Sequence, residues 1–295
     1  MCQRYTEITF EERIIKDFDW LDQMGNELFN ISGRVILITG GTGILGGSMT
    51  EYLLGEGAKV VLLGQTEAKV ESKVEQLKKK YPDVMGFAGN VLDRDFLEKV
   101  KDDVVGTWGT LDVLINAAGG NMPGAVIGEG QTIFDLEMDD FRKVSELNLD
   151  GSVVPSLVFG KQMADQGRGC ILNISSMAAT RALTRVVGYS VSKAAIDNFT
   201  KWMATELALK FGEGLRVNAI APGFFISNQN RNLLLKEDSS YTDRGKTIIA
   251  NTPMKRFGKA DELHGAVHWL ISDAASFVTG AIIPIDGGFN AFSGV

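Results

Sequence analysis

The sequence predicts an α/β fold, a single domain built on a doubly wound, mostly parallel sheet of seven strands. Short apolar runs alternate along the chain with longer amphipathic stretches, as expected of repeated strand, helix, strand units. A glycine-rich segment follows the first apolar run directly, where such folds turn from strand into helix. With 295 residues, 44% of them hydrophobic and 23% charged, the chain is long enough for one domain with a large core.

Seven apolar runs rich in Val, Ile and Leu are predicted to be strands, at residues 35–39, 59–63, 84–88, 111–116, 169–175, 215–220 and 282–285. The stretches between them have helical periodicity, and helices are predicted at 46–55, 67–80, 94–107, 139–165, 190–211 and 261–272. Because ligands of such sheets bind at the carboxyl ends of the strands, polar motifs that follow strands are expected to gather there.

Residues 1–30 are predicted to be an N-terminal extension of a domain that spans residues 31–295. Apolar residues in the extension, from Phe10 to Leu21, are spaced like one face of a helix, which we expect to pack on the domain or on a neighbouring subunit. Two long loops are expected at 121–138 and 223–245. Loops of this length in a compact domain are functional lids or partly disordered segments, and the composition leaves both open.

Composition argues against several classes of function. The chain has 30 Lys and Arg against 37 Asp and Glu, a net charge of −7, which disfavours nucleic acid or an anionic membrane as a partner. Two cysteines, Cys2 and Cys170, give neither a disulfide framework nor a zinc site, and no metal site is predicted. His264 and His268 are interpreted as helix surface or interface. Without an apolar stretch that could act as a signal peptide or span a membrane, the expected location is the cytoplasm.

The glycine-rich segment, Thr-Gly-Gly-Thr-Gly-Ile-Leu-Gly at residues 39–46, indicates a dinucleotide site. Glycines let the backbone approach a pyrophosphate, and the free amides at the start of the next helix favour its negative charge. Alone, the pattern also fits a tight strand-to-helix turn. The cofactor-binding residues expected in this segment are Gly40, Thr42, Gly43, Ile44, Leu45 and Gly46.

The adenosine end of the predicted site lacks the acidic residue that would bind a ribose 2′-hydroxyl. The second strand is followed by Gly64, Gln65 and Thr66, so nothing there would repel a 2′-phosphate. No arginine is placed to clamp such a phosphate, and Lys69 is the nearest cation. The expected cofactor is therefore NAD(P), with NADP slightly favoured, and Gln65 is a candidate contact.

Tyr189 and Lys193 are four residues apart in a predicted helix, so that both side chains lie on one face, and Ser176 precedes the tyrosine by thirteen residues. A free tyrosine has a pKa of about 10, and lowering it to near 7 requires roughly 4 kcal/mol of stabilisation of the phenolate. A neighbouring ammonium can supply part of that stabilisation. The hydroxyl of Ser176 can donate to an oxygen on which charge develops.

Further motifs follow the predicted strands: Asn-Ala-Ala-Gly at 116–119, Asn-Ile-Ser-Ser at 173–176, Tyr-Ser-Val-Ser-Lys at 189–193 and Pro-Gly at 222–223. Together with the glycine turn they resemble the short-chain dehydrogenase/reductase family over residues 33–290. One departure is that Ile44 stands where many members have glycine, with a glycine at Gly43 instead. The resemblance implies a Rossmann fold, NAD(P)-dependent interconversion of a secondary alcohol and a ketone, and commonly a homotetramer.

The resemblance also implies roles for particular residues. Tyr189 would be the general acid or base, Lys193 its electrostatic partner, and Ser176 the donor that orients the carbonyl. Asn148 would anchor a water-linked proton relay. Besides Lys193, which would also reach the nicotinamide ribose, further cofactor contacts are implied at Asn90, Val91, Asn116, Ala117, Ala118, Pro222, Gly223 and Ile226.

Substrate recognition is expected from the loops. Residues 227–232 contain four amides, a hydroxyl and an arginine, which suit a polyhydroxylated anion, although an ordinary solvated loop has similar composition. Segments 39–47, 116–123 and 223–233 resemble those of family members that act on sugar acids, and we expect a sugar acid as substrate. Gluconate, polyol and 3-oxoacyl reductases share every catalytic motif and remain alternatives, as does a nucleotide-sensing protein on the same fold. The candidate substrate residues are Asn121, Arg181, Asn228 and Arg231, with Arg181 or Arg231 holding the carboxylate.

Overall fold

The computed structural model describes residues 27–226 and 230–294. The predicted helix within residues 10–21 and the candidate substrate residue Asn228 lie outside the described residues.

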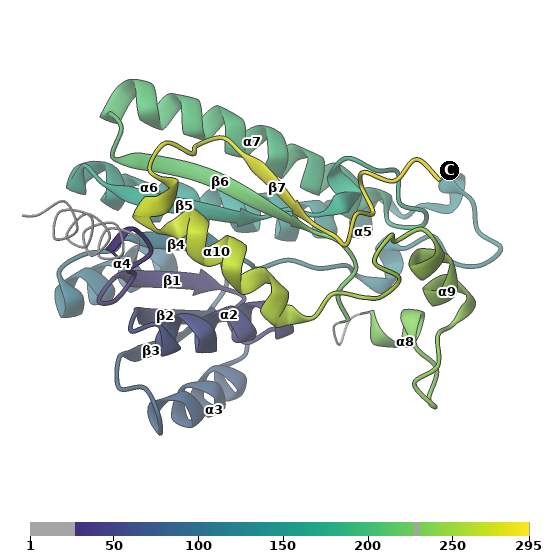
Figure 1. Ribbon diagram of the computed structural model, residues 1–295, viewed down its shortest axis with the longest axis horizontal. Helices are drawn as coiled ribbons and strands as arrows, with labels where there is room; N and C mark the ends of the chain where they lie inside the picture. Colours follow the sequence, from purple (N-terminus) through teal and green to yellow (C-terminus); the bar gives the residue numbers. More distant parts are fainter. Residues whose placement is uncertain (1–26, 227–229, 295) are drawn as a thin grey trace, which may run out of the picture.

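Seven strands form one sheet in the order β3-β2-β1-β4-β5-β6-β7 (Figure 1). They are β1 (Val35–Thr39), β2 (Lys59–Gly64), β3 (Val84–Ala88), β4 (Val113–Asn116), β5 (Gly169–Ile174), β6 (Leu215–Pro222) and β7 (Ile282–Ile285). The predicted fold class is confirmed, and every neighbouring pair of strands is parallel. Even the edge strand β7 is reached by a crossover through a helix, which brings it back parallel to β6.

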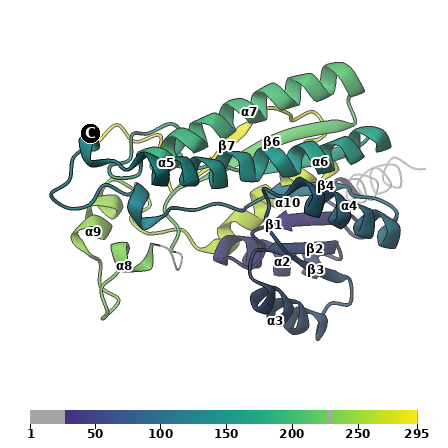
Figure 2. The same cartoon turned by 180° about the vertical axis from the view of Figure 1, so that it is seen from behind.

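Helices cover both faces of the sheet (Figures 1 and 2). One face carries α2 (Ile44–Gly55), α3 (Glu67–Lys78) and α10 (His264–Ile271), and the other carries α4 (Arg94–Trp108), α6 (Gly151–Gln166) and α7 (Val187–Phe211). Three further helices, α5 (Met138–Ser145), α8 (Arg231–Leu234) and α9 (Asp243–Ala250), belong to the segments that extend beyond the carboxyl ends of the strands. In the described part of the chain, no helix combines the length and apolar character needed to cross a membrane.

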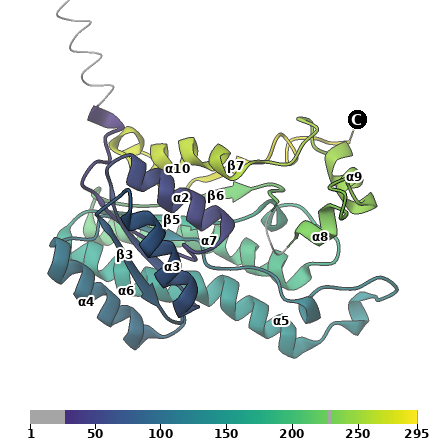
Figure 3. The same ribbon diagram turned by 90° about the horizontal axis from the view of Figure 1, so that it is seen from below.

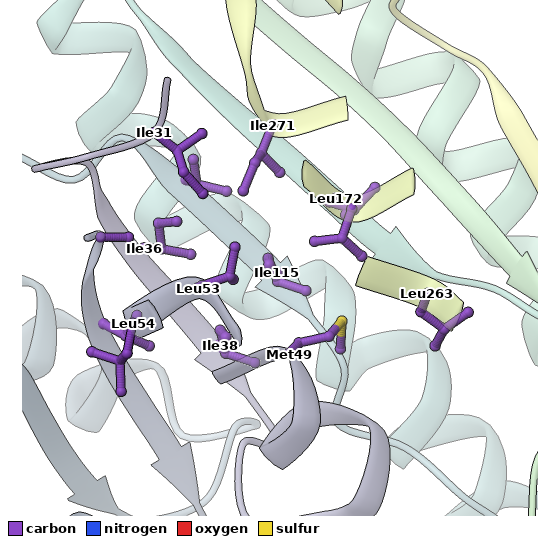
Figure 4. Close-up of a cluster of buried hydrophobic side chains, with 14 of the residues drawn as sticks. Ile31, Ile36, Ile38, Met49, Leu53, Leu54, Ile115, Leu172, Leu263 and Ile271 are labelled. Atoms are coloured by element: carbon purple, nitrogen blue, oxygen red, sulfur yellow. The ribbon is translucent and has the colours of Figure 1, made fainter. Parts of the chain in front are cut away.

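Strand side chains alternate between two apolar cores. Ile36 and Ile38 of β1 join a cluster with Met49 and Leu53 of α2 and with α10, as Figure 4 shows. Leu37, between them, faces α4 and α6 on the opposite side of the sheet. Because both faces are buried, the strands read in the sequence as uninterrupted apolar runs, without the polar alternation of a half-exposed strand.

The helix predicted over residues 139–165 is divided in three. α5 passes into one π-helical turn, η3 (Glu146–Asp150), before α6 begins at Gly151. Such wide turns are rare and are frequent at functional sites. The apolar periodicity does not reveal the extra residue in this turn, where Asn148 bonds to Gly120 of the loop after β4.

The order of the strands reverses between β1 and β4, and ligands of doubly wound sheets bind in the crevice at this point. The glycine turn follows β1 and the Asn-Ala-Ala-Gly turn follows β4, so the two face each other across the crevice. The predicted loop 121–138 carries two 3-10 turns, η1 (Pro123–Ala125) and η2 (Ile133–Asp135). The predicted loop 223–245 carries α8 and the start of α9, and Figure 3 shows these segments reaching past the sheet.

Candidate active site

The glycine turn forms a cradle that fits the pyrophosphate of a dinucleotide. Gly43 precedes α2 in an extended conformation, no side chain caps the helix, and its first turn holds no acidic residue. The first amides of α2 are therefore available to an anion. A Cβ on Gly40, whose φ is 66°, would lie 2.8 Å from the carbonyl oxygen of Ala117, and one on Gly46 would lie 2.3 Å from that of Gly40. Only glycine fits at these two positions.

Ser176, Tyr189 and Lys193 are brought together where β5 meets the start of α7. The Lys193 Nζ donates to the carbonyl oxygen of Ile174 at 2.8 Å and lies 5.6 Å from the centroid of the Tyr189 ring. The hydroxyl of Ser176 faces that of Tyr189 and acts to lower the pKa of the phenol. Two hydroxyls and an ammonium thus converge at the carboxyl edge of the sheet, as acid/base chemistry on a carbonyl oxygen requires.

Burial dominates the electrostatics of these residues. It raises the pKa of Tyr189, and the neighbouring Ser176 hydroxyl opposes that rise. Burial also lowers the pKa of Lys193 to about 8, which the carboxylate of Asp197 counteracts. The protein by itself therefore does not lower the pKa of Tyr189 toward 7, because the desolvation of the phenol has a larger effect than its polar neighbours.

Asn148 lies in the π-helical turn and holds the loop after β4. Its Nδ2 donates to the carbonyl oxygens of Gly120 and Val144, at 2.7 and 2.8 Å, and its Oδ1 accepts the Gly120 N–H at 3.0 Å. One amide hydrogen and the amide oxygen therefore fix the loop at Gly120, and the other hydrogen bonds to α5. A role for Asn148 in a proton relay stays a prediction.

Sequence reasoning missed a buried polar pair directly behind these residues. Asp197 lies one helical turn after Lys193, is only 8% exposed, and accepts a hydrogen bond from the hydroxyl of Ser175. Ser175 is the residue before Ser176, so the pair ties α7 to the end of β5. The four-residue spacing of Lys193 and Asp197 was the available signal.

Changing Asp197 to Asn should move the pH dependence of the enzyme. The amide oxygen can still accept from Ser175, but the negative charge that raises the pKa of Lys193 is lost. Burial raises the pKa of Asp197, and the charge of Lys201, the other charged group beside the carboxylate, opposes that rise. The ammonium then loses its proton at a lower pH, so the alkaline limb of kcat/KM for ketone reduction, expected near pH 8 in the wild type, shifts to lower pH. A limb that stays in place while activity falls equally at every pH would show a purely structural role.

Some of the residues expected around the adenosine are exposed and others are buried. Gln65 is exposed at the end of β2, and Asn90 is exposed with its Oδ1 accepting the Leu92 N–H at 3.0 Å. Val91 is buried in the core. The Asn116 side chain points into the sheet, where its Nδ2 donates to Ser156 and Asn173.

The remaining cofactor candidates line the turns after β4 and β6. The amides of Ala117 and Ala118 both donate to the Thr39 hydroxyl at 3.1 Å, which fixes the turn opposite the glycine cradle. At the end of β6, after Pro222, the Gly223 N–H donates to the carbonyl oxygen of Ile285 at 2.9 Å. Ile226 packs against a separate small apolar cluster of the long loop, formed by Leu234, Ile248 and Phe257.

The structure does not gather the candidate substrate residues into one site. Arg181 donates through Nε to Asn290 Oδ1 at 3.1 Å and through Nη2 to the carbonyl oxygen of the same residue. Arg231 is exposed at the start of α8. Asn121 has a buried Oδ1 without a hydrogen-bond partner among the described residues.

The two histidines of α10 contact α2. His264 Nε2 lies 2.9 Å from the Ser48 hydroxyl and His268 Nδ1 lies 2.8 Å from that of Tyr52. Within residues 27–226 and 230–294, no three His, Cys, Asp or Glu side chains are grouped so that they could hold a metal ion.

Comparison with known proteins finds relatives that match most of the chain. The family model described as enoyl-(acyl carrier protein) reductase matches residues 42–290. The uncharacterized oxidoreductase UxuB of Bacillus subtilis (strain 168) is 44% identical over 275 residues, which cover 90% of this chain and 98% of the relative. A crystal structure from Haemophilus influenzae with bound NAD, provisionally assigned as a D-mannonate oxidoreductase, is 39% identical with a TM-score of 0.83, covering 90% and 98% of the two chains. A gluconate 5-dehydrogenase from Burkholderia cenocepacia J2315, in complex with NADP and tartrate, is 27% identical with a TM-score of 0.80, covering 90% and 99%.

Proposed function

We propose, since the chain belongs to the short-chain dehydrogenase/reductase family, that it interconverts the sugar acid D-mannonate and the corresponding keto acid, D-fructuronate. Membership of the family makes it an NAD(P)-dependent oxidoreductase that acts on CH–OH groups. The observation that carries the proposal is the convergence of Ser176, Tyr189 and Lys193 at the carboxyl edge of the sheet, next to the glycine cradle.

The choice of a sugar acid is supported by the loops and by the relatives. The Haemophilus influenzae structure shares 39% of its sequence with this chain, and the Burkholderia cenocepacia enzyme acts on gluconate and holds tartrate, a hydroxy acid. The loop after β6 is rich in amides, and buried donors discriminate against substrates that lack matching polar groups.

Each residue of the site has a physical task in this reaction. Tyr189 gives a proton to the carbonyl oxygen in reduction and removes it from the hydroxyl in oxidation, and Ser176 donates to the same oxygen. The Lys193 ammonium stabilises the phenolate that forms when Tyr189 gives up its proton. The nicotinamide ring, when bound, supplies or accepts the hydride. Asn148 keeps the turn after β4 in place beside Lys193.

The end of β2 favours NADP slightly over NAD. Neither Gln65 nor Thr66, the two residues that follow β2, is acidic, and Gln65 is exposed there, so the position that would bind a ribose 2′-hydroxyl carries no carboxylate. The relatives hold either NAD or NADP. Saturation curves with both cofactors decide the preference.

The proposed function is tested by following nicotinamide absorbance with a panel of D-mannonate, D-fructuronate, gluconate, a polyol and a 3-oxoacyl thioester, with each cofactor. We expect kcat/KM to be highest for the D-mannonate and D-fructuronate couple, with Tyr189→Phe as the inactive control. Higher kcat/KM for the thioester, or no turnover of any sugar acid, would contradict the proposal.

We also propose that the protein is a homotetramer. Large apolar side chains are exposed on the outer surfaces of α6 and α7, among them Leu157, Trp202 and Leu209. Exposed large apolar side chains favour protein contacts, and symmetric association would remove them from water. Sedimentation velocity should give a mass of four chains of 32.0 kDa, and Trp202→Glu should lower it. A wild-type monomer would contradict this assembly.

A further inference from the structure

Two arginines from distant parts of the chain meet near the start of α7. Arg185 lies in the loop that leads from β5 to α7, and Arg244 lies in the first turn of α9. Arg244 Nη1 and Nη2 lie 3.3 and 3.4 Å from the hydroxyl and the carbonyl oxygen of Thr184, to which they donate. Both arginines are partly buried. Burial lowers the pKa of Arg244, and the charge of Arg185 lowers it further, as expected of two neighbouring guanidinium groups.

No acidic side chain within the described residues forms an ion pair with either arginine. Asp243, next to Arg244 in sequence, pairs with Lys246 at 3.0 Å and is almost fully exposed. Two like charges that are partly removed from water repel each other and lose hydration. The position of Arg244 at the positive end of α9 adds to this cost, because helix N-termini favour negative charge. An anion bound between the guanidinium groups would remove the repulsion.

Hydrogen bonds to Ile127 fix Arg185 relative to the reaction site. The side-chain Nε of Arg185 donates to the carbonyl oxygen of Ile127, and the backbone carbonyl oxygen of Arg185 accepts the Ile127 N–H, both at 2.9 Å. Its φ is 77°, a left-handed conformation that is costly for a residue with a Cβ and persists where the surroundings impose it. The loops after β4, β5 and β6 thus contact one another at residues 184 and 185. The loop after β5 begins near Ser176 and leads into Tyr189. Figure 3 shows α9 beyond the ends of the strands, over this region.

We infer that Arg185 and Arg244 bind the carboxylate of the substrate while Tyr189 acts on its hydroxyl or carbonyl oxygen. This inference rests on the proposed function for the identity of the sugar acid. Neither Nη of Arg185 has a hydrogen-bond partner among the described residues, so one edge of its planar fork is available to a carboxylate. Arg181, by contrast, is engaged with Asn290. The pair selects hydroxy and keto acids over neutral polyols.

The test is a calorimetric titration of D-mannonate into the protein loaded with reduced cofactor. Arg244→Gln should weaken binding roughly 10- to 100-fold, since a charge-assisted hydrogen bond is lost, and Arg244→Lys should weaken it less. Arg185→Gln should resemble Arg244→Gln. The matched control is Arg142→Gln, which removes an exposed arginine of α5 that pairs with Asp139. D-mannitol, which has the same carbon chain without the carboxylate, should bind all the variants equally weakly.

The outcomes separate this inference from the proposed function. If D-mannonate binds Arg244→Gln as tightly as the wild type, the assignment of the two arginines is overturned. If D-mannonate does not bind the wild type, the proposed substrate falls, and the assignment falls with it. If Arg181→Gln alone weakens binding, the carboxylate site lies there instead. Binding that depends on Arg185 and Arg244 without turnover would refute the proposed reaction and leave the carboxylate site standing. Turnover of the sugar acid with an unchanged KM in Arg244→Gln would support the proposed reaction and refute the carboxylate site.

Discussion

Replacing Tyr189 with Phe should lower kcat by roughly 10²- to 10⁴-fold, the usual contribution of a general acid or base. The change removes one oxygen and leaves the ring that packs beside Lys193. No other hydroxyl on α7 is placed to replace it, since Ser190 and Ser192 donate to carbonyl oxygens of Val186 and Gly188 within their own helix. The measurement is steady-state reduction of the keto acid, followed by nicotinamide absorbance.

Cofactor binding provides the control for this variant. The phenol oxygen is remote from the glycine turn in sequence and contributes nothing to that cradle, so the Kd for the reduced cofactor should stay close to that of the wild type. Fluorescence titration measures it. A variant that binds cofactor normally and keeps more than a tenth of the wild-type kcat would show that Tyr189 is not the acid or base.

Replacing Gly46 with Ala should weaken cofactor binding by roughly tenfold or more, which is about 1.4 kcal/mol. The added Cβ would lie 2.3 Å from the carbonyl oxygen of Gly40 and 2.9 Å from its carbonyl carbon. Both are backbone atoms, so the start of α2 or the turn after β1 has to move, and small overpacking of this kind costs about 1–3 kcal/mol. The first amides of α2 would then no longer converge on the pyrophosphate. The Kd for NADH and NADPH is the direct readout.

The neighbouring glycine gives a matched control. A Cβ on Gly47 would meet the carbonyl oxygen of Gly41 at 3.4 Å, an ordinary contact, so Gly47→Ala adds the same methyl group without a clash. It should keep the cofactor Kd and raise the thermal stability slightly, because alanine favours the helix. Equal cofactor affinity in the two variants would mean that the cradle does not depend on the glycine at position 46.

The sequence was sufficient for the layers of the fold and for the central residues of the site. Strands at 35–39, 84–88 and 282–285 were predicted with the bounds that the structure has, because each is a short run of mostly apolar residues between helical stretches. The helical spacing of Tyr189 and Lys193 was equally readable. Both are local properties, set by residues within a few positions of one another.

Only the tertiary structure decided the properties that depend on contacts between distant segments. The π-helical turn contains Asn148, which bonds to Gly120 in the loop after β4. The rise in the pKa of Tyr189 follows from the burial of its phenol. The meeting of Arg185 and Arg244 across about sixty residues has no signature in the chain, since each arginine by itself resembles a surface charge. Desolvation and the repulsion of like charges depend on distance in space, and a linear pattern of residues does not specify that distance.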